Sequence, residues 1–205
     1  VKSKFDGLYY GDEKSQMLQE LIRQGKELDF VKEKFNDLGN KYKSKVLQEL
    51  VRQGKELDFV KENFDELNGE YEKSKVLQEL VRQGKELDFV KSKFDGLYYG
   101  DEKSQMLQEL IRQGKELDFV KSKFDGLSME YESQVLQELI RQGKELDFVK
   151  EKYEDLSYIG RSQVLQEYSY EYKSQVLQEL IRQGKELDFV KEKFNELDYS
   201  NKKEV

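Results

Sequence analysis

The chain has 205 residues, of which 39% are charged and 36% hydrophobic, and its formal net charge is −7. It contains no Cys, His, Pro, Trp, Ala or Thr, and without Cys and His it excludes disulfide frameworks, the usual zinc sites and catalytic triads. The acidic balance argues against a non-specific polyanion binder.

No apolar run in the sequence approaches the ~20 residues that a membrane span requires. The first residues, Val1 to Asp6, lack the apolar core of a signal peptide. We therefore expect a cytoplasmic protein by default, with the compartment open if an upstream signal was removed. Because the chain starts inside a repeat unit, we also expect it to be part of a longer array.

The chain is built from tandem copies of one sequence unit. The pentapeptide VLQEL or MLQEL, followed by the decapeptide RQGKELDFVK, recurs every 29 or 30 residues as far as residue 135. Residues 1–32 and 90–121 are identical. A period of this length is typical of stacked helical hairpins, each too small to bury a core alone. The sequence therefore predicts an all-α fold, an α-solenoid of stacked antiparallel helix pairs.

The register of the repeat divides the chain into segments. Residues 1–14 match the second helix of a repeat and its turn, and residues 15–160 hold five tandem hairpins. Residues 161–173 begin a repeat that does not reach the RQGK block, so either an extra helical segment or a bulging loop is expected there. Residues 174–198 form the final hairpin, and residues 199–205 form a polar tail.

The first helix is predicted from the type unit, residues 44–73. Four apolar side chains fall within an arc of about 140° on a helical wheel, which is typical of a core-facing stripe. They are Val46, Leu47, Leu50 and Val51. Ser44 is the expected N-cap and Gly54 the expected left-handed C-cap. Two antiparallel helices are therefore predicted; the alternative is one long helix that carries Gly54 at a cost of ~1 kcal/mol.

The second helix is predicted from about Lys55 to Leu67. Its apolar stripe leaves out Phe59, which lies on another side of the helix. We expect the neighbouring repeat to cover this ring, because its burial is worth ~1.5–3 kcal/mol; lining a ligand groove is the alternative. The predicted inter-repeat core residues are Phe30, Phe59, Phe89, Phe119, Phe148 and Phe189.

The segments between units contain Gly or Asn and are predicted as turns, among them residues 39–42, 68–71, 98–101 and 157–160. They vary most between units, and most carry Tyr. Each Tyr either caps the hydrophobic edge between neighbouring units or belongs to a recognition surface. The candidate partner-binding residues are Tyr10, Tyr42, Tyr71, Tyr99, Tyr131 and Tyr158.

The corner Arg52-Gln53-Gly54 resembles that of the tetratricopeptide repeat, a helix-turn-helix unit of about 34 residues. The resemblance covers every complete unit but only at this corner. It implies a right-handed superhelix whose concave face binds peptides or other proteins. This chain departs from the family pattern, since Leu47 and Phe59 stand where the family usually keeps Gly and Ala, and the Pro that usually ends the second helix is missing.

The charged residues of the sequence do not indicate a catalytic site. The acidic residues of the second helix, such as Asp58 and Glu62, lie off its apolar stripe and are expected to be solvated. Corner residues such as Arg52 and Lys55 would form a basic edge along the stacked repeats. This edge makes nucleic-acid binding a further possibility, less favoured than protein binding. We expect a non-enzymatic scaffold without cofactor or metal that binds a protein or peptide; the alternative is a self-assembling structural protein.

Overall fold

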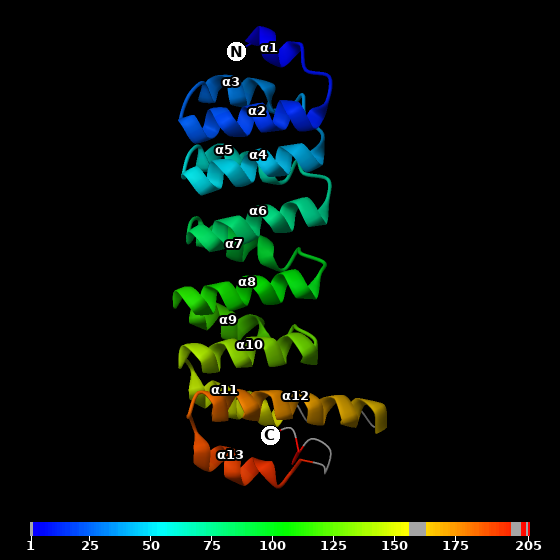
Figure 1. Cartoon of the computed structure of the whole chain (residues 1–205), viewed down its shortest axis with the longest axis vertical. Coiled ribbons are helices and arrows are strands. Elements are labelled where there is room, and N and C mark those ends of the chain that lie inside the picture. The colour runs from blue at the N-terminus through cyan, green and yellow to red at the C-terminus, as the bar shows by residue number, and fades with distance from the viewer. Residues whose placement is uncertain (1, 156–162, 198–201, 204) are drawn as a thin grey trace. The chain divides into compact units, whose positions relative to one another are not determined.

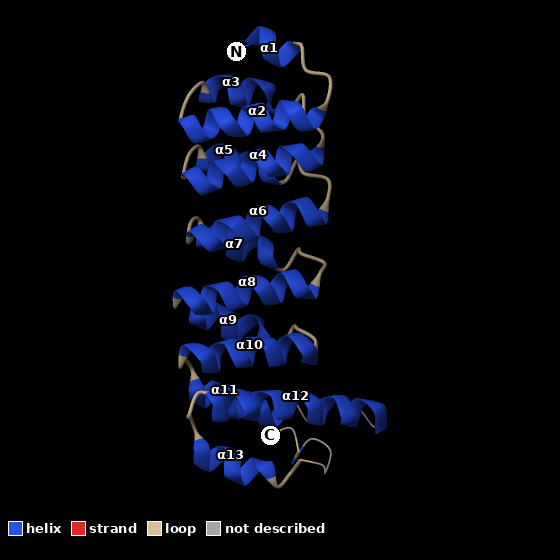
Figure 2. Cartoon of the chain, in the orientation of Figure 1, coloured by secondary structure: helices blue, strands red, loops and turns tan. Residues whose placement is uncertain are grey.

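The computed structural model is all-α over the residues that the structure describes, which are 2–155, 163–197, 202, 203 and 205. These residues form thirteen assigned helices and no strand (Figures 1 and 2). The chain divides into two compact units, residues 1–102 and 103–205. Within each unit, long and short helices alternate and neighbours pack together, which confirms the predicted α-solenoid of paired helices.

Each hairpin joins a long first helix to a shorter second helix. The first helices are α2 (Gly11–Gln24), α4 (Asn40–Gln53), α6 (Glu70–Gln83), α8 (Gly100–Gln113), α10 (Met129–Gln142) and α12 (Gln163–Arg182). The second helices are α1 (Lys2–Asp6), α3 (Leu28–Phe35), α5 (Leu57–Phe64), α7 (Leu87–Phe94), α9 (Leu117–Phe124), α11 (Leu146–Asp155) and α13 (Leu187–Phe194). In the first unit α4 packs between α2 and α6, and in the second unit α10 packs against α12.

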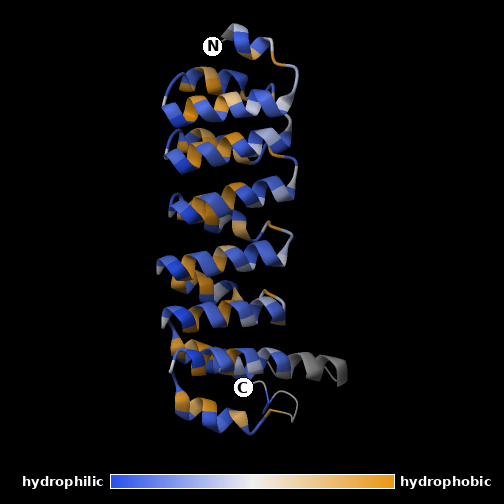
Figure 3. Ribbon diagram, viewed as in Figure 1, coloured by the Kyte–Doolittle hydropathy of each residue, from blue (hydrophilic) through white to orange (hydrophobic). Residues whose placement is uncertain are grey.

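The core of each hairpin comes from the predicted apolar stripes. In α4 all four stripe residues, Val46, Leu47, Leu50 and Val51, are fully buried. Val60 and Phe64 of α5 and Leu67 beyond it are buried as well. Figure 3 shows hydrophobic and hydrophilic residues interleaved along the helices, as amphipathic helices require. Burial of such side chains, at ~1.5–3 kcal/mol each, is the main stabilising contribution.

The corner glycine ends the first helix as predicted. Gly54 has φ 63° and ψ 34°, in the left-handed region. Its N–H donates to the Val51 carbonyl at 3.0 Å, and the next N–H, of Lys55, donates to the Leu50 carbonyl at 2.9 Å. This is the Schellman arrangement, which satisfies the last carbonyls of the helix. The alternative prediction, one long helix that continues through Gly54, is therefore wrong.

A glutamate two residues after the glycine also adopts the left-handed conformation. Glu56 has φ 49° and ψ 43°, a conformation that costs a residue with a Cβ about 1–2 kcal/mol. The second helix consequently starts at Leu57, later than the predicted Lys55, and ends at Phe64, before the predicted Leu67. The same strained position recurs as Glu27, Glu56, Glu86, Glu116, Glu145 and Glu186.

The first helix starts earlier than predicted. Ser44 is not the N-cap: it lies inside α4, is buried, and its hydroxyl donates to the Glu72 carbonyl at 2.9 Å. The N-cap is Gly39, and the helix begins at Asn40. Residues 40–42, 70–71 and 100–101 of the predicted turns are thus helical, because the polar residues before Ser44 and its equivalents add a further turn of helix. The predicted turn at 157–160 lies outside the described residues.

The interrupted repeat at residues 161–173 joins the hairpin that follows. Residues 163–182 form one helix, α12, so this part of the segment is helical and continuous with the first helix of the last hairpin. Residues 161 and 162 lie outside the described residues. The bulging loop is therefore excluded for residues 163–173.

We expect Gly54→Ala to lower the free energy of unfolding by about 1 kcal/mol or more, because Ala is strained at positive φ. A Cβ at Gly54 would also meet the Lys85 ammonium, which must move. Gly184 shares φ 63° but has open space around it, so Gly184→Ala carries the backbone strain alone. Urea unfolding followed by circular dichroism compares the two. Equal losses would contradict a contribution from Lys85.

Candidate functional site

The outlying phenylalanines contact the preceding hairpin. The Phe59 ring packs edge to face on Phe35, with centroids 5.2 Å apart. Such aromatic pairs contribute about 0.5–1.5 kcal/mol beyond area burial. The same contact joins Phe30 to Phe5, Phe89 to Phe64, Phe148 to Phe124, and Phe189 to Tyr153. Phe30 is buried, whereas Phe59, Phe89, Phe119, Phe148 and Phe189 are half-buried.

A ladder of arginines and buried glutamates links consecutive first helices along the corner edge, which we define as the RQGKE blocks and the helix ends beside them. Glu49, only 2% exposed, accepts hydrogen bonds from Arg23 of α2 and from Arg52 of its own helix. Arg52 continues to Glu79 at 3.2 Å. The hydrogen bond between Arg23 and Glu49 raises the pKa of the Arg23 guanidinium above its usual value. The second unit repeats the ladder through Arg112, Glu138, Arg141 and Glu179.

Lysines tie the corners together in two further ways. Lys55 donates to the Ile22 carbonyl at 2.9 Å, at the negative end of α2 where a cation is favourable. Lys32 pairs with the strained Glu56 of the next corner at 3.0 Å. Equivalent pairs are Lys61–Glu86, Lys121–Glu145 and Lys150–Glu186.

These contacts account for the constancy of the corner block. Its Arg, Lys and Glu side chains join one hairpin to the next, so every copy needs them. They also leave the corner arginines matched by carboxylates in both units, which opposes the phosphate-binding edge considered from the sequence. Glu49, Glu79 and Glu138 were not among the predicted residues, although a Glu three residues before each corner Arg is at helical pairing distance.

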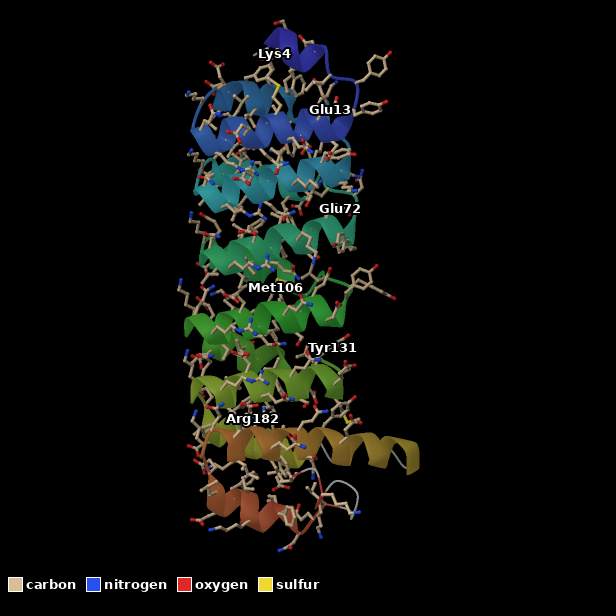
Figure 4. The ribbon with its side chains drawn as sticks, viewed as in Figure 1. Lys4, Glu13, Glu72, Met106, Tyr131 and Arg182 are labelled. Atoms are coloured by element: carbon tan, nitrogen blue, oxygen red, sulfur yellow. The ribbon has the colours of Figure 1, made fainter. Side chains whose placement is uncertain are left out.

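The opposite edge carries the predicted tyrosines. We call it the tyrosine edge and define it as the segments before, and the first turns of, the first helices. In Figure 4 the labelled Glu13 and Glu72 mark it in the first unit and Tyr131 marks it in the second. Tyr10, Tyr71 and Tyr99 are exposed, at 69%, 58% and 47% of their surface.

The remaining predicted tyrosines differ in setting. Tyr42 and Tyr131 lie within α4 and α10 and are half-buried. The Tyr42 ring covers Gly11, where an added Cβ would lie 2.7 Å from it. Tyr158 lies outside the described residues. Two further tyrosines of this edge, Tyr9 at 94% and Tyr98 at 82%, are the most exposed large hydrophobic side chains among the residues that the structure describes.

A small pocket opens on the tyrosine edge of the first unit, with a volume of about 140 Å³. Its lining residues are Phe64, Asp65, Glu70, Lys73, Lys93, Gly96 and Leu97. Lys93 donates to both carboxylate oxygens of Asp65, at 2.9 and 2.7 Å. Lys73 lies 3.9 Å from Glu70. In the sequence, Tyr71 directly follows the lining residue Glu70, and Tyr98 directly follows the lining residue Leu97.

In α10, Glu132 stands at the position that Lys73 holds in α6 and that a lysine holds in each of the other first helices. Glu132 is half-buried beside Asp125, Lys152 and Asp155, and Lys152 binds both aspartates, at 2.9 and 3.3 Å. Burial, with repulsion from Asp125 and Asp155 outweighing attraction to Lys152, raises the pKa of Glu132 to about 7.

Glu132 is therefore expected to make the stability pH-dependent. A carboxyl that binds its proton more tightly in the folded chain destabilises the fold above its folded pKa, and this penalty disappears as pH falls toward the unfolded value of about 4.3. Glu132→Gln is expected to stabilise by about 1–3 kcal/mol at pH 8, allowing for partial exposure, and not at pH 4. Urea unfolding at both pH values tests this, with the exposed Glu130→Gln as control. A pH-independent gain would contradict it.

Two classes of site have no support among the residues that the structure describes. No group of three or more acidic residues there is placed to hold a metal ion. None of the helices in the same part of the chain combines the length and apolar character needed to cross a membrane.

The geometry defines a helical-repeat protein with one edge committed to contacts between hairpins and another that displays aromatic side chains. No protein-family model matches the chain, and a search of curated proteins likewise returns no match. The resemblance of the corner to tetratricopeptide repeats therefore stays a prediction.

Proposed function

We propose that this protein is a non-enzymatic repeat scaffold that binds proteins or peptides along its tyrosine edge. The observation that carries the proposal is the exposure of Tyr9, Tyr10, Tyr71 and Tyr98, each more than half exposed. A tyrosine combines an apolar ring with a hydroxyl and loses few torsions on binding, which is why it is enriched in binding hot spots.

The contrast with the corner edge supports this assignment. Corner side chains such as Arg52 and Lys55 are already bonded to the neighbouring hairpins. The exposed tyrosines instead lie in the segments before the first helices or in their first turns, which differ among units except that the copies carrying Tyr9 and Tyr98 are identical. Because their rings are exposed, we expect their loss to leave the contacts between repeats intact. Variation on one edge of a constant framework is typical of surfaces that bind different partners.

The test compares partner capture by the chain and by its variants. Proteins cross-linked to the wild type are compared with those cross-linked to Tyr98→Ser/Tyr99→Ser, and Gln24→Ser is the control at the exposed corner edge. We expect a specific partner that the tyrosine variant loses and the control retains. Identical capture by all three would overturn the proposal.

Self-association is the alternative function. Within each compact unit, consecutive hairpins meet through the same kinds of contact, so the repeat is complementary to a copy of itself. Arg182 and Lys191 of the last hairpin are 64% and 77% exposed at the side chain and pair with Glu179 and Asp188 of their own helices. A further copy of the unit would bring the matching carboxylates. Light scattering separates the functions: particles that grow with concentration favour assembly, and a concentration-independent monomer contradicts it.

A further inference from the structure

The connection between α5 and α6 contains the one asparagine of the chain that is followed by a glycine, Asn68-Gly69. Both residues lie outside the helices, and Asn68 is exposed. Gly69 is extended, with φ −109° and ψ 129°. Its carbonyl accepts from the Lys73 N–H at 3.0 Å, whereas its own N–H donates to no backbone carbonyl in the part of the chain that the structure describes. The backbone therefore does not hold the peptide nitrogen that joins the two residues.

This pair of residues has the chemistry of a spontaneous modification. The side-chain amide of asparagine is among the thermolabile groups of proteins. The peptide nitrogen of the following residue can attack its Cγ and close a succinimide ring. Glycine favours this attack, because the missing Cβ leaves the nitrogen unshielded and the backbone free to rotate. A connecting segment also opens at a lower cost in free energy than a helix does.

A carboxylate lies beside the peptide unit that would attack. Glu72, in the first turn of α6, places a carboxylate oxygen in the space where a Cβ of Gly69 would stand. That space adjoins the Gly69 Cα, to which the nitrogen is bonded, so the carboxylate is placed to accept the N–H proton. Gly39 is the N-cap of α4 as Gly69 is of α6, yet nothing lies within 4 Å of its Cβ position. The neighbouring carboxylate is therefore not a feature of every N-cap glycine.

We propose that Asn68 and Gly69 form a self-modifying site at which Asn68 deamidates. The Gly69 nitrogen gives its proton to Glu72 and forms a bond to Cγ of Asn68. The bond from Cγ to Nδ2 breaks, and Nδ2 takes up the proton and leaves as ammonia. Water then opens the ring at either carbonyl carbon and returns a proton to the nitrogen, which yields aspartate or isoaspartate. The reaction consumes water, releases ammonia, and needs neither oxidant nor reductant.

The product changes the tyrosine edge of the first unit. Deamidation adds a negative charge in the sequence between Glu66 and Glu70, which are both exposed, and like charges repel. Isoaspartate also lengthens the main chain by an atom immediately before Gly69, where α6 begins. The modification thus produces a second form of the chain, altered close to Tyr71. This inference goes beyond the proposed function and does not depend on it.

The experiment incubates the full chain at neutral and at mildly alkaline pH and follows each asparagine by peptide mapping and mass spectrometry. Asn36 is an exposed control that is followed by Asp37, and Asn63 is a buried control whose amide donates to the Phe59 carbonyl within α5 at 2.8 Å. We expect Asn68 to convert about tenfold faster than either control or more, since one lacks the glycine and the other reacts only after its helix opens. Conversion of Asn68 no faster than that of Asn36 would overturn the proposal.

Gly69→Ala tests the site directly, with Gly39→Ala as the matched control. Both glycines are N-caps with backbone angles that alanine adopts. In Gly69→Ala the new Cβ shields the nitrogen and displaces the flexible end of Glu72. We expect this variant to slow the conversion of Asn68 about tenfold or more, and Gly39→Ala to leave the rate unchanged. Equal rates in the two variants would overturn the proposal, and circular dichroism melts confirm that both are folded.

Glu72→Gln tests the proton transfer. Glutamine keeps the size of the side chain but lacks the basic carboxylate, so we expect the conversion of Asn68 to slow severalfold. Glu66→Gln removes an exposed carboxylate of the same connection and is expected to leave the rate unchanged. A rate in Glu72→Gln equal to that of the wild type would overturn the role assigned to Glu72.

Discussion

Glu79→Ala is expected to lower the free energy of unfolding by about 2–3 kcal/mol. Glu79 is 3% exposed and accepts hydrogen bonds from Arg52 of the preceding hairpin, at 3.2 Å, and from Gln83, at 3.0 Å. Arg82 lies 3.7 Å away. Truncation leaves the donors without their acceptor; the arginines are partly exposed and recover some hydration, so the expected loss stays below that of a fully buried pair.

Glu20→Ala is the matched control. Glu20 holds the same position in α2, but its side chain is 54% exposed and its contacts, with Arg23 and Gln24, lie within its own helix. Its loss is expected to leave the free energy of unfolding nearly unchanged, as for an exposed helical pair. Urea unfolding measures both variants, and a loss for Glu79→Ala as small as that for Glu20→Ala would show that the ladder does not stabilise the array.

A third variant separates charge from volume. Glu79→Leu fills the site without a carboxylate, and replacement of buried ion pairs by apolar residues is often neutral. Because Arg52 and Arg82 remain, we expect Leu to recover packing but not the hydrogen bonds, with a loss between those of Ala and the wild type. If Glu79→Leu were more stable than the wild type, the ladder would serve the specificity of stacking and not the stability of the fold.

The repeat period and the apolar stripes were sufficient to predict the hairpins and the left-handed glycine. Gly54 could be predicted because its role is local: it ends a helix within its own five-residue neighbourhood. The left-handed Glu56 could not, since its strained backbone is stabilised by Lys32, a side chain of the preceding hairpin. No pattern within one unit contains that partner.

The same reason explains what was missed at the candidate site. A Glu amid VLQEL looks solvated on a single helix, and only packing of the next first helix buries Glu49. The sequence predicts the tyrosines on the edge opposite the corners, but how far each ring is exposed depends on where its first helix begins. Tyr42 falls within α4 and covers Gly11, whereas Tyr98 precedes α8 and stays exposed.

Phe35→Ala is expected to have the largest effect, about 3–5 kcal/mol, the usual loss for a buried phenylalanine. The Phe35 side chain is fully buried, packs edge to face on Phe59, and has the Lys43 ammonium 5.2 Å from its ring centre. Its removal empties a contact shared by two hairpins, so both lose packing.

Phe194→Ala is the matched control, because Phe194 holds the same position in α13 but is half-buried, with the Lys202 ammonium 5.9 Å from its ring. Its truncation is expected to cost clearly less, about 1–2 kcal/mol, in proportion to the apolar area it buries. Because hairpins in a repeat array contact only their neighbours, Phe35→Ala is expected to speed amide hydrogen exchange in α3 and α5 first. Uniform acceleration throughout the chain would instead show that the array unfolds as one cooperative body, and equal losses for the two variants would contradict the role of the shared contact.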